Sequence, residues 1–370
     1  MKILHLIPSY LPAQDSPGPI LAAHGLNREL VRRGHDLTVY TTGRDATRVI
    51  DGVKVYYFPL TFKRWYYSGA LHKALAEKVK NFDLVHISSV FLAVSTLGAH
   101  YAKKNHKPYV ISCHGSLMRE PLQYHSLKKK LYLALAEKRN LADAAAIHFT
   151  SAKEKEEYLA LGFPAKNAVV VSNCLDIEQS QGERARRDGK KIILFLGRIS
   201  PGKGLEVLVE AFSAIVKQIP EAVLLIAGPD HKHYKQNIQF LISNFHLEDK
   251  ILFTGMLSGQ DKLAALERAD VLVLPSDSES FGMAALEAMA VGVPVILTDG
   301  VGIAGEVAEA GAGLVVGKEV KLVAAAILRI FNNPDLARNM GRWGRELVSR
   351  EFSCSKAAEA MAREYERYQA

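Results

Sequence analysis

The sequence predicts an α/β protein built from two Rossmann-like domains that face each other across a deep cleft. Short apolar runs alternate with amphipathic segments along the chain, which is typical of parallel sheets covered by helices. The 370 residues are too many for a single hydrophobic core. A charged stretch without an apolar face, residues 178–191, separates two such series and indicates an interdomain linker. We therefore expect domains at 1–177 and 178–354, with a last helix at about 355–370 that packs back on the first domain.

The N-terminal domain is predicted to open with a βαβ unit. A strand at 2–7 precedes a loop rich in Pro, Ser and Gly, and a helix at 20–33 ends at Gly34. The second strand follows at 37–42. Further strands are expected at 83–88, 109–112, 146–150 and 169–172, with a helix at about 126–141.

The C-terminal domain repeats this alternation from Ile192 onward. The helix at 205–219 carries apolar residues at the i, i+3, i+4, i+7 spacing of an amphipathic helix. Strands are expected at 192–196, 222–227, 271–274, 293–298 and 314–316. Ligands of such folds lie at the carboxyl ends of the strands, so the loops that follow these strands are the candidate sites.

The stretch from Val271 to Thr298 organises this domain. A buried strand leads into a polar loop, and a helix then runs to Gly292. Glu279 lies in the loop, and Glu287 lies eight residues later, about two turns inside the helix. Between them, the first backbone N–H groups of the helix lack intrahelical partners, at Phe281, Gly282 and Met283. A helix N-terminus with free N–H groups binds phosphate, so this arrangement suits a sugar nucleotide.

The phrase PSDSESFGMAALEAMAVGVPV, with its Glu-x7-Glu spacing, resembles the signature of glycosyltransferase family 4. That family consists of retaining enzymes of the GT-B fold, and RRGHDLTVYT resembles its N-terminal domain. The resemblance implies that Glu279 contacts the transferred sugar and Glu287 the nucleotide ribose. It also implies transfer of a hexose-type unit from a nucleotide sugar to a glycan or lipid-linked acceptor, as in cell-surface polysaccharide or glycolipid synthesis. The structural alternative is an amphipathic crossover helix with solvated carboxylates.

A second motif, FLGRISPGKG at 195–204, follows the first strand of the C-terminal domain. It matches a P-loop up to Lys203, but Gly204 replaces the Ser or Thr whose hydroxyl would hold Mg²⁺. In family 4 the Arg and Lys of GR-x4-KG contact the donor diphosphate, and these positions are Arg198 and Lys203. Two fixed cations can stabilise the departing diphosphate without a metal. The alternative is a solvated Arg and Lys after a strand.

Other patterns do not predict a cofactor or a metal site. GVGIAG at 300–305 fits GxGxxG, but too few residues follow for the full helix of a dinucleotide fold, and it resembles instead the glycine loop of family 4. Asp277-x-Glu279 could mimic a metal-binding pair, but it lies at a helix N-terminus. His231 and His233 lack a third ligand in their loop. We therefore expect no metal and no cofactor beyond the nucleotide-sugar substrate.

In the N-terminal domain, two positions match the family's donor site. His114 lies in a loop after the strand that ends near Ser112, where family members often have a His that contacts the donor sugar. Gly18, between Pro17 and Pro19 before the first helix, matches the loop that brings N–H groups to the donor phosphate. A lone histidine is more often structural, but its position after a strand end favours a role in the site.

Composition limits the partners and the compartment. The formal charge of +8 and the pI of about 9.2 suit anionic partners: nucleotide diphosphates, nucleic acid or a phospholipid surface. The three cysteines, Cys113, Cys174 and Cys354, are far apart and odd in number, so we expect reduced thiols in the cytoplasm. No secretory signal is visible near Lys2, because the apolar run that follows is too short.

Two basic and aromatic segments suggest peripheral docking at the inner membrane face. They are FKRWYY at 62–67 and SLKKKLYL at 126–133. The alternative is that Trp65 packs in the core and Lys128–Lys130 form a solvated helix face. Two other functions stay open: a GT-B sugar-nucleotide epimerase or hydrolase, and a non-catalytic anion-binding module. No recognisable nucleic-acid motif is present.

Overall fold

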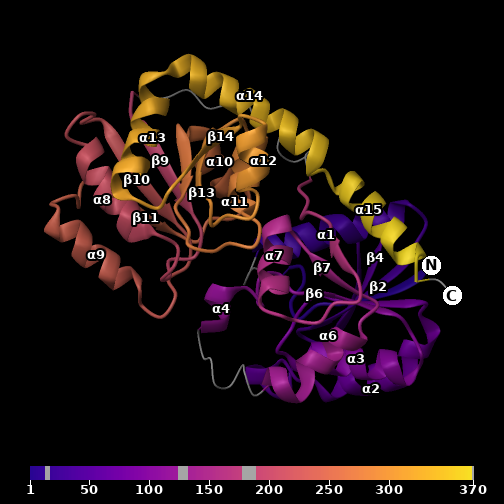
Figure 1. Ribbon diagram of the computed structural model, residues 1–370. Helices are drawn as coiled ribbons and strands as arrows, with labels where there is room; N and C mark the ends of the chain where they lie inside the picture. Colours follow the sequence, from indigo (N-terminus) through magenta and orange to yellow (C-terminus); the bar gives the residue numbers. More distant parts are fainter. Residues whose placement is uncertain (13–16, 124–131, 177–188, 369–370) are drawn as a thin grey trace. The chain divides into compact units, whose positions relative to one another are not determined.

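The computed structural model describes residues 1–12, 17–123, 132–176 and 189–368 (Figure 1). The chain forms two compact units, one of Met1–Leu175 with Cys354–Ala370 and one of Asp176–Ser353. Each unit is a sheet covered by helices, so the predicted α/β class is confirmed. Of the predicted linker, residues 178–188 lie outside the described residues.

The N-terminal unit contains an eight-stranded sheet in the order β3-β4-β2-β1-β5-β6-β7-β8. The strands are β1 Lys2–Leu6, β2 Asp36–Thr42, β3 Ala46–Ile50, β4 Val53–Phe58, β5 Leu84–Ile87, β6 Tyr109–Ser112, β7 Ala146–Phe149 and β8 Ala168–Val170. The described ladder is parallel except where β3 pairs antiparallel with β4 through a turn at Asp51 and Gly52, both at positive φ. The sequence analysis predicted the other six strands but not this hairpin.

Helices cover both faces of this sheet. They are α1 Pro17–Arg32, α2 Gly69–Lys78, α3 Ala93–Lys104, α4 Arg119–Gln123, a π-helix Leu133–Glu137, α6 Lys138–Asp143, α7 Ala152–Ala160 and α15 Cys354–Glu366, with 3₁₀ turns at Lys63–Trp65 and Val79–Asn81. The unit has two hydrophobic cores, one on each face of the sheet. In one core, every second strand residue packs against α1 and α15; in the other, the strand residues between them pack against α2, α3, α6 and α7. Strands that alternate between two apolar layers form the centre of a three-layer unit.

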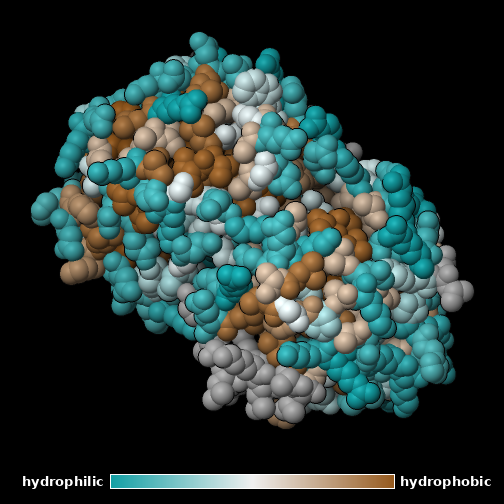
Figure 2. Space-filling view, viewed as in Figure 1, coloured by the Kyte–Doolittle hydropathy of each residue, from teal (hydrophilic) through white to brown (hydrophobic). Residues whose placement is uncertain are grey.

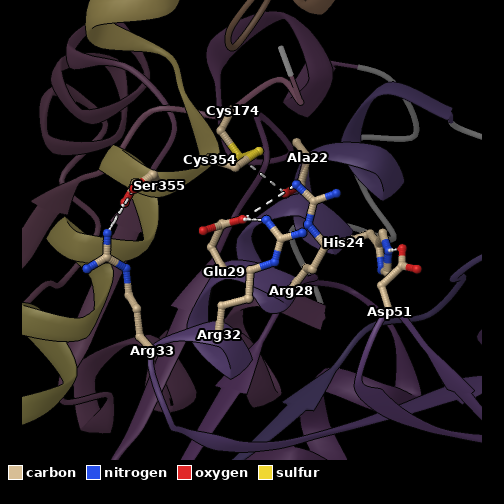
Figure 3. Close-up of polar contacts among 10 residues, drawn as sticks. All are labelled: Ala22, His24, Arg28, Glu29, Arg32, Arg33, Asp51, Cys174, Cys354 and Ser355. Atoms are coloured by element: carbon tan, nitrogen blue, oxygen red, sulfur yellow. Dashed lines mark hydrogen bonds and ion pairs between the residues drawn. A yellow bond between two sulfur atoms is a disulfide. The ribbon is translucent and has the colours of Figure 1, made fainter. Parts of the chain in front are cut away.

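The C-terminal helix α15 lies along α1, within the N-terminal unit (Figure 3). Arg33 donates to the carbonyl oxygen and to the hydroxyl of Ser355. At the start of α15, Cys354 forms a disulfide with Cys174, with their Cα atoms 4.8 Å apart. The expectation of three reduced thiols is therefore wrong for these two. Residues separated by 180 positions meet because the chain returns to its first unit, and Cys113 is the free, buried cysteine.

The C-terminal unit contains a six-stranded parallel sheet in the order β11-β10-β9-β12-β13-β14. Its strands are β9 Lys191–Leu196, β10 Ala222–Ala227, β11 Ile251–Gly255, β12 Val271–Leu274, β13 Val295–Thr298 and β14 Gly313–Val316. Its helices are α8 Leu205–Ile215, α9 Lys235–Asn244, α10 Gly259–Arg268, α11 Met283–Ala290, α12 Ala304–Glu309, α13 Val320–Asn332 and α14 Pro334–Glu351. The strand order reverses between β9 and β12, and ligands of open α/β sheets bind at such a switch point.

On the face drawn in Figure 2, hydrophilic residues cover most of the surface, and hydrophobic residues show in patches between them. Among the residues that the structure describes, no helix combines the length and the apolarity needed to cross a bilayer.

Candidate functional site

The two motifs of the C-terminal unit follow β9 and β12, the strands on either side of the switch point. The GRISPGKG loop leaves β9 and ends at α8, and the SDSES loop leaves β12 and ends at α11. The N–H of Asp277 donates to the carbonyl oxygen of Gly202 at 2.8 Å, so the two loops are tied together.

Gly204 allows the loops to approach this closely. Its φ is +69°, and a Cβ atom there would lie 2.0 Å from the carbonyl oxygen of Pro275. A side chain would therefore have to push the loop after β12 away from the loop after β9. A Ser or Thr, as a P-loop requires, does not fit at this position, which agrees with the departure from that motif noted in the sequence.

The glycine loop after β13 holds the SDSES loop from the other side. Glu279 donates its N–H to Gly300 and accepts from the N–H of Gly302, at 3.0 and 2.8 Å. A Cβ atom at Gly300 would lie 2.3 Å from the carbonyl oxygen of Ser276. The helix that follows, α12, has only six residues. This loop therefore supports Glu279, and it does not open the long helix of a dinucleotide fold.

Lys203 and Glu279 form an ion pair in the centre of this arrangement. The Nζ atom of Lys203 lies 3.0 Å from Oε2 of Glu279, and both side chains are mostly shielded from solvent. The hydroxyl of Ser276 donates to the same oxygen at 3.4 Å. The structure thus brings together the two residues that sequence reasoning had assigned to neighbouring parts of a donor.

The N-terminus of α11 lies directly after Glu279. Gly282 is the N-cap, at a φ of +111°, and Met283 is the first helical residue. The Phe281 side chain is buried and packs edge-on against Phe352, so only its backbone is available to a ligand. The first N–H groups of a helix have no intrahelical acceptor, and the end carries about half a positive charge.

Glu287 lies slightly more than one turn inside α11, and not two turns as expected, because the helix begins at Met283. Its side chain is 9% exposed. Lys262 of α10 donates to Oε1 of Glu287 at 2.8 Å. Sequence reasoning missed Lys262, because it lies in an ordinary amphipathic helix with no motif around it.

The remaining charges of these loops are more exposed. Arg198 is exposed, and it lies near His231, whose pKa is lowered by partial burial and by the Arg198 and Lys232 cations. Lys318 pairs with Asp277 at 2.5 Å. Across the described stretches of the chain, no group of three or more His, Cys, Asp or Glu side chains is arranged to hold a metal ion.

In the N-terminal unit, Gly18 lies inside the first turn of α1 and not before the helix as expected. The helix begins at Pro17, since proline fits the first turn, where its missing N–H has no intrahelical partner anyway. The N–H of Gly18 still belongs to the first turn, so it lacks an intrahelical acceptor.

His114 lies in a tight turn after β6. The N–H of Ser116 donates to the carbonyl oxygen of Cys113, and the two central residues, His114 and Gly115, have φ of +47° and +77°. Positive φ at both central positions is the signature of a type I′ turn. The half-buried His114 ring has no hydrogen-bond partner among the described residues. Burial, with His148 and His5 nearby, lowers the pKa of His114 to about 3, so the ring is neutral.

A directed chain of hydrogen bonds runs below this turn. The His148 Nε2–H must donate to the Val171 carbonyl oxygen at 2.7 Å, so its Nδ1 accepts from Ser112, 2.6 Å away. Ser112 then accepts from His86 Nε2–H at 2.6 Å, and His86 Nδ1 accepts from the Tyr365 hydroxyl at 2.5 Å. Each ring therefore carries a single proton.

His5 extends this layer as a second neutral ring. Its Nδ1–H donates to Asn27 Oδ1 at 2.8 Å, and its Nε2 accepts from the Ser88 hydroxyl at 2.7 Å. The ring also stacks on His86. Sequence reasoning missed these residues. One sequence signal was available: near the end of four strands, a His or Ser takes the place of an apolar residue on one face of the sheet, two positions after an apolar residue. The pairs are Ile3 and His5, Leu84 and His86, Val110 and Ser112, and Ala146 and His148.

Two family models match the chain on either side of the boundary between the units. Glycosyl transferases group 1 matches residues 176–347, and Glycosyltransferase Family 4 matches residues 22–179. The chain is a glycosyltransferase of family 4. The family resemblance noted in the sequence is thus confirmed across most of the chain.

Individual proteins agree with this assignment. The chain is 29% identical over 320 residues to an uncharacterised glycosyltransferase of Methanocaldococcus jannaschii, with 80% of each chain covered. It is 26% identical over 343 residues to the GDP-mannose:cellobiosyl-diphosphopolyprenol alpha-mannosyltransferase of Xanthomonas oryzae, covering 88% of this chain and 86% of that one. The Anabaena protein HepE, solved with UDP and glucose, matches with a TM-score of 0.76 at 19% identity, and 99% of each chain is covered. This glycosyltransferase has the GT-B fold.

Proposed function

We propose that this glycosyltransferase moves a hexose-type unit from a nucleotide sugar to a glycan or lipid-linked acceptor, with retention of configuration and without a metal ion. The observation that supports this most directly is the Lys203–Glu279 pair beside the N-terminus of α11. A cation and a row of N–H groups suit a diphosphate, and a carboxylate next to them suits sugar hydroxyls. The Xanthomonas enzyme is named for the nucleotide sugar GDP-mannose, and the Anabaena protein was solved with UDP and glucose.

Each site residue then has a specific task. Arg198 and Lys203 stabilise the negative charge that grows on the diphosphate as the sugar leaves. The N–H groups of Gly282 and Met283 bind phosphate oxygens, and Glu287 accepts from ribose hydroxyls. Lys203 can turn part of its interaction from Glu279 to the diphosphate when the donor binds, which frees Glu279 for the sugar.

In the N-terminal unit, His114 contacts the donor sugar, and the N–H of Gly18 contacts a phosphate oxygen. A neutral imidazole can both donate and accept, so His114 serves as a hydrogen-bond partner of a sugar hydroxyl and not as an acid. We assign no side-chain nucleophile and no covalent intermediate.

The partners of the carboxylates support the proposed metal independence. Asp277 and Glu279 are the only acidic pair of the loop, and each is bonded to a lysine, Lys318 and Lys203. A divalent ion between them would have to displace two ammonium groups from short contacts. The cations and the helix end supply the positive charge that a metal would otherwise bring.

We also propose that the enzyme acts in the cytoplasm at the inner membrane face, in cell-surface polysaccharide or glycolipid synthesis. The 3₁₀ turn Lys63–Trp65 and its N-cap residue Phe62 contribute two exposed aromatic side chains, since Phe62 is 63% exposed and Trp65 50%. Trp65 is therefore not in the core, and the exposed Lys63 lies beside it. Aromatic rings and lysines together favour an anionic interface. The basic segment Lys128–Lys130 lies outside the described residues.

Two experiments test these proposals. Incubation with a panel of nucleotide sugars, with and without acceptor, followed by mass analysis, should give product only when an acceptor is present. Product without acceptor would indicate an epimerase or a hydrolase. For docking, flotation with anionic liposomes at low salt should carry the wild type upward. A Phe62→Ser/Trp65→Ser variant and a Lys128/Lys129/Lys130→Glu variant should stay below, and wild type that stays below at low salt would contradict docking.

A further inference from the structure

The buried carboxylate of Glu154 is not used by the proposed chemistry, although it lies beside His114. Glu154 lies on the first turn of α7, and the residue is 1% exposed. An ionised carboxylate away from water costs several kcal/mol unless hydrogen bonds compensate for the lost hydration. The bonds that Glu154 makes therefore indicate what it stabilises.

Glu154 accepts three hydrogen bonds from two segments of the chain. Its Oε2 atom accepts from the N–H and the hydroxyl of Thr150, at 2.7 and 2.8 Å. Its Oε1 atom accepts from the N–H of Gly115 at 2.5 Å. The first segment is the end of β7, and the second is the turn after β6.

The helix α7 itself does not require this side chain. The N-cap residue Ser151 accepts from the N–H of Glu154 at 3.1 Å, which is one half of a capping box. In a complete capping box, the acidic residue at this position returns to the N–H of the N-cap. Here the carboxylate bonds to Thr150, which precedes the N-cap, and crosses to Gly115. Its two oxygens thus join the end of β7 to the turn that carries His114.

The bond to Gly115 acts on the peptide that sets the direction of His114. In a β-turn the N–H between the two central residues has no partner inside the turn. Glu154 fixes this N–H and, with it, the plane of the His114–Gly115 peptide. A histidine at a φ of +47° occupies a sparsely populated conformation that costs of order 1 kcal/mol or more, and surrounding contacts must maintain it.

We propose that Glu154 is a positioning residue for glycosyl transfer. By bonding to the N–H of Gly115, its carboxylate holds the turn in the conformation that presents the neutral His114 ring to the donor sugar. This inference rests on the proposed contact between His114 and the sugar. A misplacement of about 1 Å in such a contact can lower the rate by about 10²-fold.

The test is a double-mutant cycle between Glu154→Gln and His114→Ala, measured as kcat and donor KM. A glutamine keeps the size of the side chain but replaces one acceptor oxygen with a donor group, so it cannot accept from both segments. Glu154→Gln should lower kcat by about 10- to 100-fold with donor KM within about threefold. In the His114→Ala background, the same change should cost less than about twofold, because its target is already absent.

The control is Glu156→Gln on the exposed side of the same helix, which should keep wild-type kcat. If Glu154→Gln does not fold, the same cycle is measured with Glu154→Asp. The shorter aspartate keeps the carboxylate but places it too far from the N–H of Gly115 to accept its hydrogen bond.

Two results would overturn the proposal, and they differ from each other. Equal losses in the wild-type and His114→Ala backgrounds would show that Glu154 supports the fold without acting through His114. Wild-type kcat in His114→Ala would remove the sugar contact itself, and the positioning role with it, while glycosyl transfer would stand.

Discussion

The carboxyl ends of the strands differ in kind between the two units. In the C-terminal unit, the loops and helices that follow the strands carry charged pairs that are mostly shielded from solvent, Lys203 with Glu279 and Lys262 with Glu287. In the N-terminal unit, the strand ends carry buried neutral rings whose protons are fixed by a one-way chain of hydrogen bonds ending at Val171. The difference teaches that an ion pair can exchange a partner for a ligand, whereas a directed neutral chain can only hold its shape. The first suits binding of an anion, and the second suits a rigid support.

The largest expected effect concerns acid unfolding of the N-terminal unit. Burial lowers the pKa of His5 and His148 to about 4, that of His114 to about 3, and that of His86 well below its usual value. In the unfolded chain these rings are protonated below about pH 6.5, whereas in the folded unit they stay neutral. The free energy of unfolding therefore falls as the pH drops from about 6.5 toward 4. Each ring contributes up to about 1.4 kcal/mol per pH unit, so the loss should reach several kcal/mol.

Two carboxyl groups oppose this trend. Burial raises the pKa of Glu137 and Glu154, so their protonation favours the folded state as the pH falls, but four rings outnumber them. The sequence holds two tryptophans, one in each unit, Trp65 and Trp343. Urea unfolding followed by fluorescence in Trp343→Phe and Trp65→Phe variants therefore reports on each unit separately. If the free energy of unfolding depended on pH equally in both units, the buried neutral rings would not distinguish the N-terminal unit from the C-terminal unit.

The next effect is on turnover and belongs to the C-terminal unit. Arg198→Ala and Lys203→Ala should each lower kcat by about 10²-fold or more, about 2.7 kcal/mol, because they stabilise charge on the leaving diphosphate. The matched control is Lys318→Ala, which removes a lysine–carboxylate contact from the same loops at Asp277. It should lose less than about tenfold. Steady-state kinetics and circular dichroism separate loss of turnover from loss of fold, and normal turnover in either alanine variant would remove that residue from the site.

A smaller effect concerns the close approach of the two loops. Gly204→Ala should destabilise the C-terminal unit by about 1–3 kcal/mol, because the new Cβ atom meets the Pro275 carbonyl oxygen as well as the strain of positive φ. Gly162→Ala in the N-terminal unit is the control, since it has a similar φ of +72° with nothing within 4 Å. Unfolding midpoints give both values. If the two substitutions cost the same, the contact at Pro275 has no importance of its own.

Much of the fold could be predicted because its signals are local. The apolar strands, the helix that ends at Gly292, and the two loops that carry Lys203 and Glu279 were all visible as patterns of neighbouring residues. The β3–β4 hairpin was missed even though Asp51-Gly52 is a favoured turn sequence, because the short exposed strand β3 shows no apolar alternation.

The missed parts depend on contacts between distant positions. Lys262 meets Glu287 across 25 residues, and Cys174 meets Cys354 across 180. Glu154 lies 39 residues from Gly115, and within its own helix it resembles an ordinary capping residue. The buried histidine rings and their partners come from four strands and α15. Because these residues are far apart in the sequence, no short stretch of residues predicts that they meet. Only the sheet order brings these side chains together.

The central claim, that the C-terminal unit binds a nucleotide sugar through cations and a helix end, is tested most directly by thermal shift. A panel of nucleotide sugars is screened in excess EDTA against the wild type, Lys203→Ala and the Lys318→Ala control. At 100 times its Kd, a donor should stabilise the wild type and the control by about 2.7 kcal/mol, and Lys203→Ala should show little shift. A shift that disappears in EDTA and returns with Mg²⁺ or Mn²⁺, or a full shift in Lys203→Ala, would contradict this account.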